Sequence, residues 1–344
     1  MIDRHPTRYF AFSIALITSA ALFVPDAASG QYVGPRMPDG HPDLQGNWSN
    51  ATVTPVQRPE GEEPVLTQEE VAQREQWDGV CPPNPGTVEC GRDRREGTSD
   101  VAILGGNEYN EVYWDRGTRV AVVNGEPRSS LITYPIDGRR SPLNAEGQAR
   151  EDERRAFLAQ FGESDNPENR VLQDRCLVSF GHHGGPPMTP NYGYNNNYTI
   201  VQTADYVMLL TEMVHDARII RLGEPAQLPD HITPWFGDSW GHWEGETLVV
   251  ETTNMNPTQT YMGVAPTPEL TVHERFTRVA EDQILYEFTV DDPSTYAEPW
   301  GGEVPFWQFD DLLYEYNCHE GNYAMPAILS GARYEEQQAA ENNN

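Results

Sequence analysis

Three side chains that can carry out acid–base and anion-binding chemistry lie close together at His215, Asp216 and Arg218. They follow the run Tyr206–Val214, whose alternating apolar residues predict a strand with one buried face. His215 is in phase with that face, and the other two residues fall on the opposite face. Imidazole titrates near neutral pH and guanidinium binds carboxylates or oxyanions. We therefore interpret His215 as an acid or base, Arg218 as an oxyanion or carboxylate holder and Asp216 as a substrate contact. A purely structural Asp–Arg ion pair is the alternative.

Glu274 is a second candidate acid or base, because it is in phase with the apolar residues of a predicted strand at 270–279. A carboxylate on an apolar face is costly without a partner, and burial raises its pKa toward values useful for proton transfer. We expect Glu274 to act together with His215. A shift of phase by one residue would instead turn His273 and Arg275 inward.

The block Tyr314–Tyr323 concentrates aromatic, acidic and histidine side chains beside a cysteine. We interpret it as the lip of a site in which His319 and Glu320 assist catalysis. A C-terminal strand with an aromatic plug is the alternative. The aromatic residues expected to contact a substrate are Trp243, Tyr286, Tyr316 and Tyr323.

The segment 237–241 reads G-x-S-x-G, which forms the nucleophile elbow of serine hydrolases when a strand precedes the serine and a helix follows it. His183 and the two glycines after it resemble the oxyanion loop of lipases, and Asp310 and His319 stand in the order of a triad. Prolines precede the segment, however, and a β-branched run follows it. We therefore expect a turn that leads into a strand, and a nucleophilic Ser239 is only an alternative.

A metal-dependent hydrolase that uses His182, His183 and His242 is a further alternative, although the histidines show no local ligand spacing. No cofactor is expected. All 23 basic residues are arginine, and the absence of lysine excludes a Schiff base, a pyridoxal anchor and a P-loop lysine. With 53 acidic residues and a formal net charge of −30, the chain is not expected to bind nucleic acid.

The N-terminus predicts export. Arginines precede a short apolar run, and small residues follow before Gln31, so residues 1–30 are expected to be a secretory signal peptide. No second long apolar run predicts a membrane span in the mature chain. Four cysteines in an exported chain suggest two disulfides, Cys81–Cys90 across a local loop and Cys176–Cys318 over a long distance, with the other pairings open. The expected location is periplasmic or secreted, and nothing indicates an oligomeric state.

The elements that must position these residues are mostly strands. Short alternating runs between Gly, Asp and Pro turns predict a mainly β chain, built as an antiparallel up-and-down, lipocalin-like β-barrel of about eight strands around a ligand cavity. An extended N-terminal arm, two short helices at 67–77 and 145–161, and short strands that pack on the barrel are expected over 31–161. The barrel body is expected over 162–336, and 337–344 is expected to be a disordered tail. The strands expected in the body are 197–202, 206–214, 217–222, 247–253, 270–279, 283–291, 305–308 and 312–318.

Six sequence blocks of the chain are distinctive: 39–46 (DGHPDLQG), 195–202 (NNNYTIVQ), 212–218 (EMVHDAR), 241–250 (GHWEGETLVV), 274–278 (ERFTR) and 314–323 (YEYNCHEGNY). They resemble those of a widespread family of exported bacterial proteins of unassigned function. The resemblance covers nearly the whole mature chain, and it implies an exported, β-rich protein without implying an activity.

Taken together, these features predict an exported, cofactor-independent enzyme that acts by general acid–base chemistry on a small apolar or aromatic molecule held in the barrel cavity. Elimination, isomerisation and hydrolysis are the reactions that such groups can support. A non-catalytic carrier of a hydrophobic ligand is the alternative, because barrels of this size serve both purposes.

Overall fold

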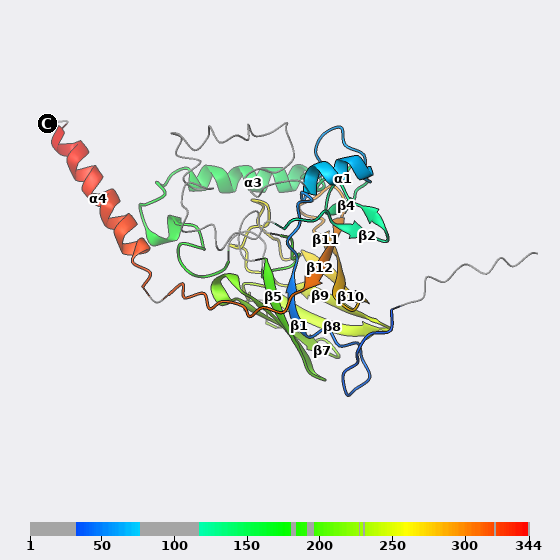
Figure 1. The fold of residues 1–344 in the computed structure, drawn as a ribbon. Coiled ribbons are helices and arrows are strands. Elements are labelled where there is room, and N and C mark those ends of the chain that lie inside the picture. The colour runs from blue at the N-terminus through cyan, green and yellow to red at the C-terminus, as the bar shows by residue number, and fades with distance from the viewer. Residues whose placement is uncertain are drawn as a thin grey trace, which may run out of the picture. The chain divides into compact units, whose positions relative to one another are not determined.

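Nine strands close into a β-barrel in the computed structural model, which describes residues 32–75, 117–179, 184–190, 196–226, 228–229, 231–319 and 321–342 (Figure 1). In order around the barrel they are β1 (Gly46–Ser49), β5 (Asn197–Gln202), β6 (Tyr206–Thr211), β7 (Ala217–Leu222), β8 (Asp238–Glu244), β9 (Thr247–Thr253), β10 (Thr271–Ala280), β11 (Gln283–Asp291) and β12 (Trp300–Gln308). The ring closes where β12 pairs with β1, with Trp48 opposite Gln308 and Ser49 opposite Trp307. The predicted mainly β barrel fold is confirmed, with nine strands rather than about eight.

Strict alternation of side chains sets the inner and outer faces of the barrel. In β11, every second residue from Ile284 to Val290 is buried, and the residues between them are less buried. In β10, Val272, Glu274 and Phe276 are buried on the same face, so the predicted phase of this strand is confirmed. A period of two is what a half-buried strand requires, because successive side chains point to opposite faces of the sheet.

One pair of neighbouring strands departs from the antiparallel pattern. β7 and β8 run parallel, and their pairing covers only Ile220–Leu222 and Ser239–Gly241. A parallel pair needs a crossover rather than a tight turn, and the long connection 223–237 supplies it. The first half of β7, Ala217–Ile219, therefore has no partner on β8. We call this incompletely paired junction of β7 and β8 the seam.

The N-terminal arm contributes directly to the barrel. β1 lies within the segment expected to be an arm, and it is the strand that closes the ring, so the barrel is not confined to residues after 162. Outside the ring, β2 (Val122–Val123) and β3 (Glu126–Pro127) form a small hairpin, and β4 (Ile132–Tyr134) pairs with β12.

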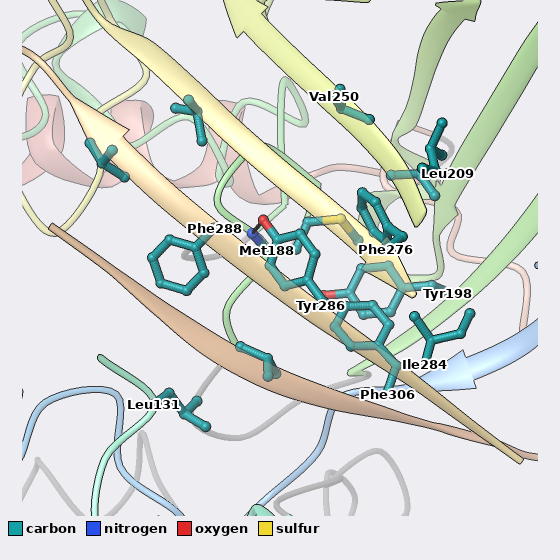
Figure 2. Close-up of a cluster of buried hydrophobic side chains, with 14 of the residues drawn as sticks. Leu131, Met188, Tyr198, Leu209, Val250, Phe276, Ile284, Tyr286, Phe288 and Phe306 are labelled. Carbon is teal, nitrogen blue, oxygen red and sulfur yellow. Dashed lines mark hydrogen bonds between the residues drawn. The ribbon is translucent and has the colours of Figure 1, made fainter. Parts of the chain in front are cut away.

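Side chains fill the interior of the barrel, where a ligand cavity was expected. Tyr198, Phe276, Tyr286 and Phe306 converge there from different strands, and Met188 enters beside them from the segment 184–190 (Figure 2). The aromatic rings pack at centroid distances of 4.9 Å for Phe276–Tyr286, 5.5 Å for Tyr286–Phe306 and 5.4 Å for Tyr198–Phe306. The space that we expected to hold a ligand is thus largely a packed core.

The two predicted short helices are present as α1 (Gln68–Glu75) and α3 (Ala145–Leu158). The Thr67 N–H and hydroxyl donate to the Glu70 carboxylate, and the Thr67 hydroxyl accepts from the Glu70 N–H, so the predicted capping box starts α1. A third helix, α4 (Ala324–Asn342), runs through most of the segment expected to be a disordered tail. The Gln, Ala and Glu residues at 337–341 favour a helix, and the polarity of the tail alone led to the wrong expectation.

Residues 309–319 are irregular where a strand was expected at 312–318. The predicted Cys176–Cys318 disulfide holds it to the body of the protein, with 5.6 Å between the two Cα atoms. The predicted Cys81–Cys90 disulfide and the predicted signal peptide lie outside the described residues. Within the ranges that the structure describes, no helix is both long enough and apolar enough to cross a bilayer.

Candidate functional site

The turn between β6 and β7 decides which of the clustered polar residues face inward. It is a 3₁₀ turn, Met213–His215, in which Val214 and His215 take left-handed backbone angles with φ of 60° and 48°. The turn ends the alternation of β6. β7 pairs with β6 in a register that places Arg218 opposite Leu209 on the inner face. Our expectation was therefore wrong for both residues: His215 is exposed and Arg218 is buried. Left-handed angles are strained for a β-branched residue such as Val214, and such strain is typical of functional sites.

Arg218 is part of a hydrogen-bond network inside the barrel. Its Nη2 donates to Glu274 Oε2 over 2.6 Å, and Glu274 is fully buried. The Tyr286 hydroxyl donates to Glu274 Oε1 over 2.8 Å and itself accepts from the Met188 N–H over 2.9 Å. The Thr252 hydroxyl lies 3.5 Å from Glu274 Oε2. Glu274 is thus the centre of the network, and burial beside this carboxylate raises the pKa of Tyr286 well above its usual value.

Two nitrogen donors of Arg218 take no part in this network. Nε and Nη1 are buried and have no hydrogen-bond partner among the described residues, although the side chain is only 2% exposed. A guanidinium has five N–H bonds, and burying unmatched ones costs free energy. An acceptor oxygen placed beside these two nitrogens would remove that cost.

A cleft of about 520 Å³ lies at the seam. Its apolar wall includes Leu177, Ile219 and the aromatic rings of Tyr206, Trp235 and Phe236. The ionisable residues that line it are His215, Asp216, Arg218, Arg221 and Asp238. We call it the seam cleft. Its volume suits a small organic molecule, and a mostly apolar wall with a few polar groups is typical of ligand sites.

Asp216 is the acidic residue of the seam cleft that lacks an ion-pair partner among the described residues. Burial raises the pKa of Asp216 to about 6, although the Ser179 N–H, which donates to Oδ2 over 2.7 Å, acts in the opposite direction. A carboxyl group that titrates so close to neutral pH, in a cleft, is a candidate for proton transfer. The sequence pointed to this residue only as a substrate contact.

His215 and His319 lie beside the seam cleft on the solvent side. His215 Nδ1 is 2.8 Å from the backbone oxygen of Tyr316, and because a carbonyl oxygen can only accept, Nδ1 is the donor of this hydrogen bond. The His319 ring lies 6.3 Å from the His215 ring, between centroids, and both side chains are exposed. Tyr316 contributes its backbone to this arrangement, and Tyr323 is 81% exposed.

The second arginine of the seam cleft is already paired. Arg221 forms an ion pair with Asp238, which also accepts from the Leu228 N–H, and the Arg221 guanidinium stacks over the Trp240 ring at 4.1 Å. The contacts of Arg221 join β7 to β8, and the Leu228 N–H bond ties the crossover 223–237 to β8. The ion pair also neutralises the charge of Arg221 within the cleft.

Ser239 is not in a nucleophile elbow. It is the second residue of β8, and β8 continues through Trp243 into a hairpin with β9, so no helix follows the serine. The Ser239 hydroxyl lies 2.9 Å from that of Thr252. The strand–turn–helix geometry of a nucleophile elbow is therefore not formed at Ser239, and the expected turn into a strand is present: a β-branched run continues the chain as β9.

Other predicted site residues lie away from the seam cleft. Trp243 stacks on His41 at 4.9 Å, and His242 pairs with Glu244 at 3.4 Å on the exposed face of the hairpin. Tyr286 is fully buried in the core, where its hydroxyl is already bonded. The described residues contain no group of three or more His, Cys, Asp or Glu side chains placed to hold a metal ion. The predicted site residues His182, His183 and Glu320 lie outside the described residues.

The aromatic wall of the seam cleft was missed by the sequence analysis. Trp235 and Phe236 belong to the crossover 223–237, which is too long for a hairpin loop, and loops of this length are often functional. That length was the available signal. No protein-family model, curated protein sequence or solved structure matches the chain, so its function must be inferred from the geometry of this site.

Proposed function

We propose that the protein is an exported, cofactor-independent enzyme that transfers protons on a small, largely apolar or aromatic molecule bound in the seam cleft. The observation that carries this proposal is Asp216, a carboxyl group whose pKa is raised to about 6 at the edge of an apolar, aromatic-lined cleft. General acid–base catalysis is most efficient when the pKa of the catalytic group lies near the working pH.

Asp216 is the proposed proton acceptor and donor. His215, the preceding residue in the chain, has an exposed side chain beside the cleft and is the proposed proton relay between Asp216 and solvent. Arg218 is the proposed holder of a substrate oxygen, because it lines the seam cleft and has two nitrogen donors without a partner among the described residues, Nε and Nη1. An oxyanion that develops on this oxygen during proton removal would be stabilised by the guanidinium.

Glu274 has a different role from the one expected. It is fully buried, does not line the seam cleft, and is bonded to Arg218, Tyr286 and Thr252. We assign it as a positioning residue that fixes the orientation of the Arg218 guanidinium. The acid–base pair is therefore Asp216 with His215, in place of Glu274 with His215.

Export is part of the proposal. The Cys176–Cys318 disulfide supports it, because such bonds persist in oxidising compartments such as the periplasm and the extracellular space. The predicted signal peptide supports it from the sequence.

The proposal is tested by proton exchange. The wild-type protein is incubated in D2O with a panel of small alicyclic and aromatic compounds, and deuterium incorporation or a change of structure is followed by mass spectrometry and NMR. Asp216→Asn should lower the exchange rate by at least about a hundredfold. Asp205→Asn, at an exposed turn between β5 and β6, is the matched control and should retain the wild-type rate.

Two outcomes would contradict the proposal. Equal exchange rates in the wild type and Asp216→Asn would remove Asp216 from the chemistry. Tight binding of a compound that is recovered chemically unchanged, without deuterium, would favour the non-catalytic carrier instead.

A further inference from the structure

The charge balance of the seam cleft restricts the ligand it can accept. Arg218 is paired with Glu274, and Arg221 is paired with Asp238. Each guanidinium charge is thus matched by a carboxylate. Of the acidic, histidine and arginine residues that line the seam cleft, only Asp216 and the solvent-exposed His215 remain without such a match among the described residues.

An anionic ligand would meet an unfavourable environment here. Above the pKa of Asp216 its carboxylate is negative and partly buried, and no unmatched guanidinium offsets it. The whole chain has a formal net charge of −30, which repels anions at longer range. Like charges brought together in a partly desolvated site are strongly unfavourable.

A ligand without an acceptor would also leave the site incomplete. Arg218 is the residue that both lines the seam cleft and has buried, unpartnered donors at Nε and Nη1. These N–H groups call for an oxygen lone pair. An ammonium group cannot supply one, since it is a donor only.

We propose that the seam cleft takes a neutral carbonyl compound, such as a ketone, enone or lactone on an alicyclic or aromatic body, with its oxygen on Arg218 and its adjacent C–H bond toward Asp216. The inference rests on the proposed function and names its substrate class. The apolar body would lie against Ile219, Trp235 and Phe236.

The corresponding reaction is an isomerisation through an enolate. The Asp216 carboxylate takes the proton from the carbon next to the carbonyl group. The electron pair of that C–H bond forms a C=C bond, and the carbonyl π pair moves to the oxygen, which accepts hydrogen bonds from Arg218. Asp216 then returns the proton to the same carbon, or to the γ carbon of an enone. No oxidant, reductant or further reactant is needed.

Four ligands with the same phenyl ring separate the head-group chemistries. Acetophenone carries a neutral hydrogen-bond acceptor, and benzoate carries an anionic group. Ethylbenzene carries no polar group, and 1-phenylethylamine carries a cationic group. Binding to the wild-type protein is measured by calorimetry and saturation-transfer NMR at about pH 7.5. Acetophenone should bind roughly tenfold more tightly than each of the others, since a hydrogen bond to a charged donor contributes about that much.

Two variants test the charge argument itself. Glu274→Gln removes the carboxylate that balances Arg218, so benzoate should gain at least about tenfold and overtake acetophenone. Asp216→Asn removes the repelling charge, so benzoate should gain while acetophenone binding stays within about twofold of the wild type. Circular dichroism establishes that each variant is folded. If Glu274→Gln does not fold, the Asp216→Asn comparison still decides the question.

The outcomes distinguish a failure of this inference from a failure of the proposed acid–base function. If benzoate or 1-phenylethylamine binds the wild type most tightly, or if neither folded variant changes the preference, the neutral-carbonyl inference is wrong and the acid–base function stands. If none of the four ligands binds, the seam cleft is not the ligand site, and both proposals fail.

Discussion

Arg218 on β7 and Glu274 on β10 form an ion pair of 2.6 Å through the interior of the barrel, although their strands are not neighbours in the sheet. The pair is almost fully buried, at 2% and 0% side-chain exposure. It links the packed core to the seam cleft, because Arg218 belongs to both. An ion pair of this kind costs desolvation energy, so its presence among aromatic side chains calls for a role other than stability.

Removal of one partner of this pair should be far more costly than removal of both. We expect Arg218→Met and Glu274→Leu to lose about 3–5 kcal/mol each, since each leaves a buried unpaired charge, and the double variant to lie within about 1–2 kcal/mol of the wild type. Urea unfolding of all four proteins gives the coupling energy. The exposed Arg275–Glu244 pair, at 2.9 Å, is the control and should contribute less than about 1 kcal/mol. This account would be contradicted if the loss in the double variant equalled the sum of the losses in the two single variants.

The Tyr286 hydroxyl should contribute measurably to stability. It joins the Met188 N–H to Glu274, so Tyr286→Phe leaves a buried amide and a carboxylate oxygen each short of a partner. We expect a loss of about 1–3 kcal/mol in the free energy of unfolding. Tyr323→Phe, at an exposed position, is the matched control and should be neutral. An equal effect in the two variants would mean that the network does not anchor the segment 184–190.

Much of the barrel could be predicted from alternation alone. The predicted bounds of β5, β7, β9 and β11 match those of the structure, and the inward phase of Glu274 followed from its apolar neighbours. Local patterns suffice for these elements, because a strand with one buried face must alternate with a period of two.

The seam and the orientation of His215 depend on information that alternation does not contain. His215 was placed by extending β6 through Met213, but the chain turns there with two left-handed residues and resets its phase. The parallel pairing of β7 with β8 is set by the path of the crossover, and the strand β1 is only four residues long. Non-local pairing of this kind cannot be derived from the periodicity of the strands.

Ser239 should be dispensable for catalysis. Its hydroxyl is hydrogen-bonded to that of Thr252, and β8 continues past it as a strand. We expect Ser239→Ala to retain proton exchange and to lose about 1 kcal/mol of stability. Serine-directed fluorophosphonates should not label the wild type. Loss of activity together with covalent labelling at Ser239 would revive the hydrolase mechanism.

The disulfide should matter for stability and for the order of the cleft rim. It joins residues 142 positions apart, and Cys318 lies two residues after Tyr316, whose backbone oxygen bonds to His215. The paired change Cys176→Ser and Cys318→Ser should lower the free energy of unfolding by about 2–5 kcal/mol. Below the melting temperature, the rate of proton exchange should fall by a larger factor than the affinity for acetophenone, because His215 loses its contact with Tyr316. Comparison of exchange rate with ligand affinity checks this, and an equal fall in both would show a general loss of folded protein.

Asp216 should reduce stability at neutral pH. Its pKa is about 6 in the folded protein against an ordinary value of 3.8, so the native state binds the proton more tightly than the unfolded state. The contribution to stability is therefore fully present below about pH 3.8 and is lost as the pH rises through about 6. Asp216→Asn removes this dependence, and Asn can still accept from the Ser179 N–H. In urea unfolding, the free energy of unfolding of the variant relative to that of the wild type should rise between about pH 4 and pH 7, by about 1–3 kcal/mol at most. Asp205→Asn should show no such trend. A stability difference that does not change with pH would mean that Asp216 keeps its ordinary pKa in the folded protein, and proton transfer near neutral pH would then need another group.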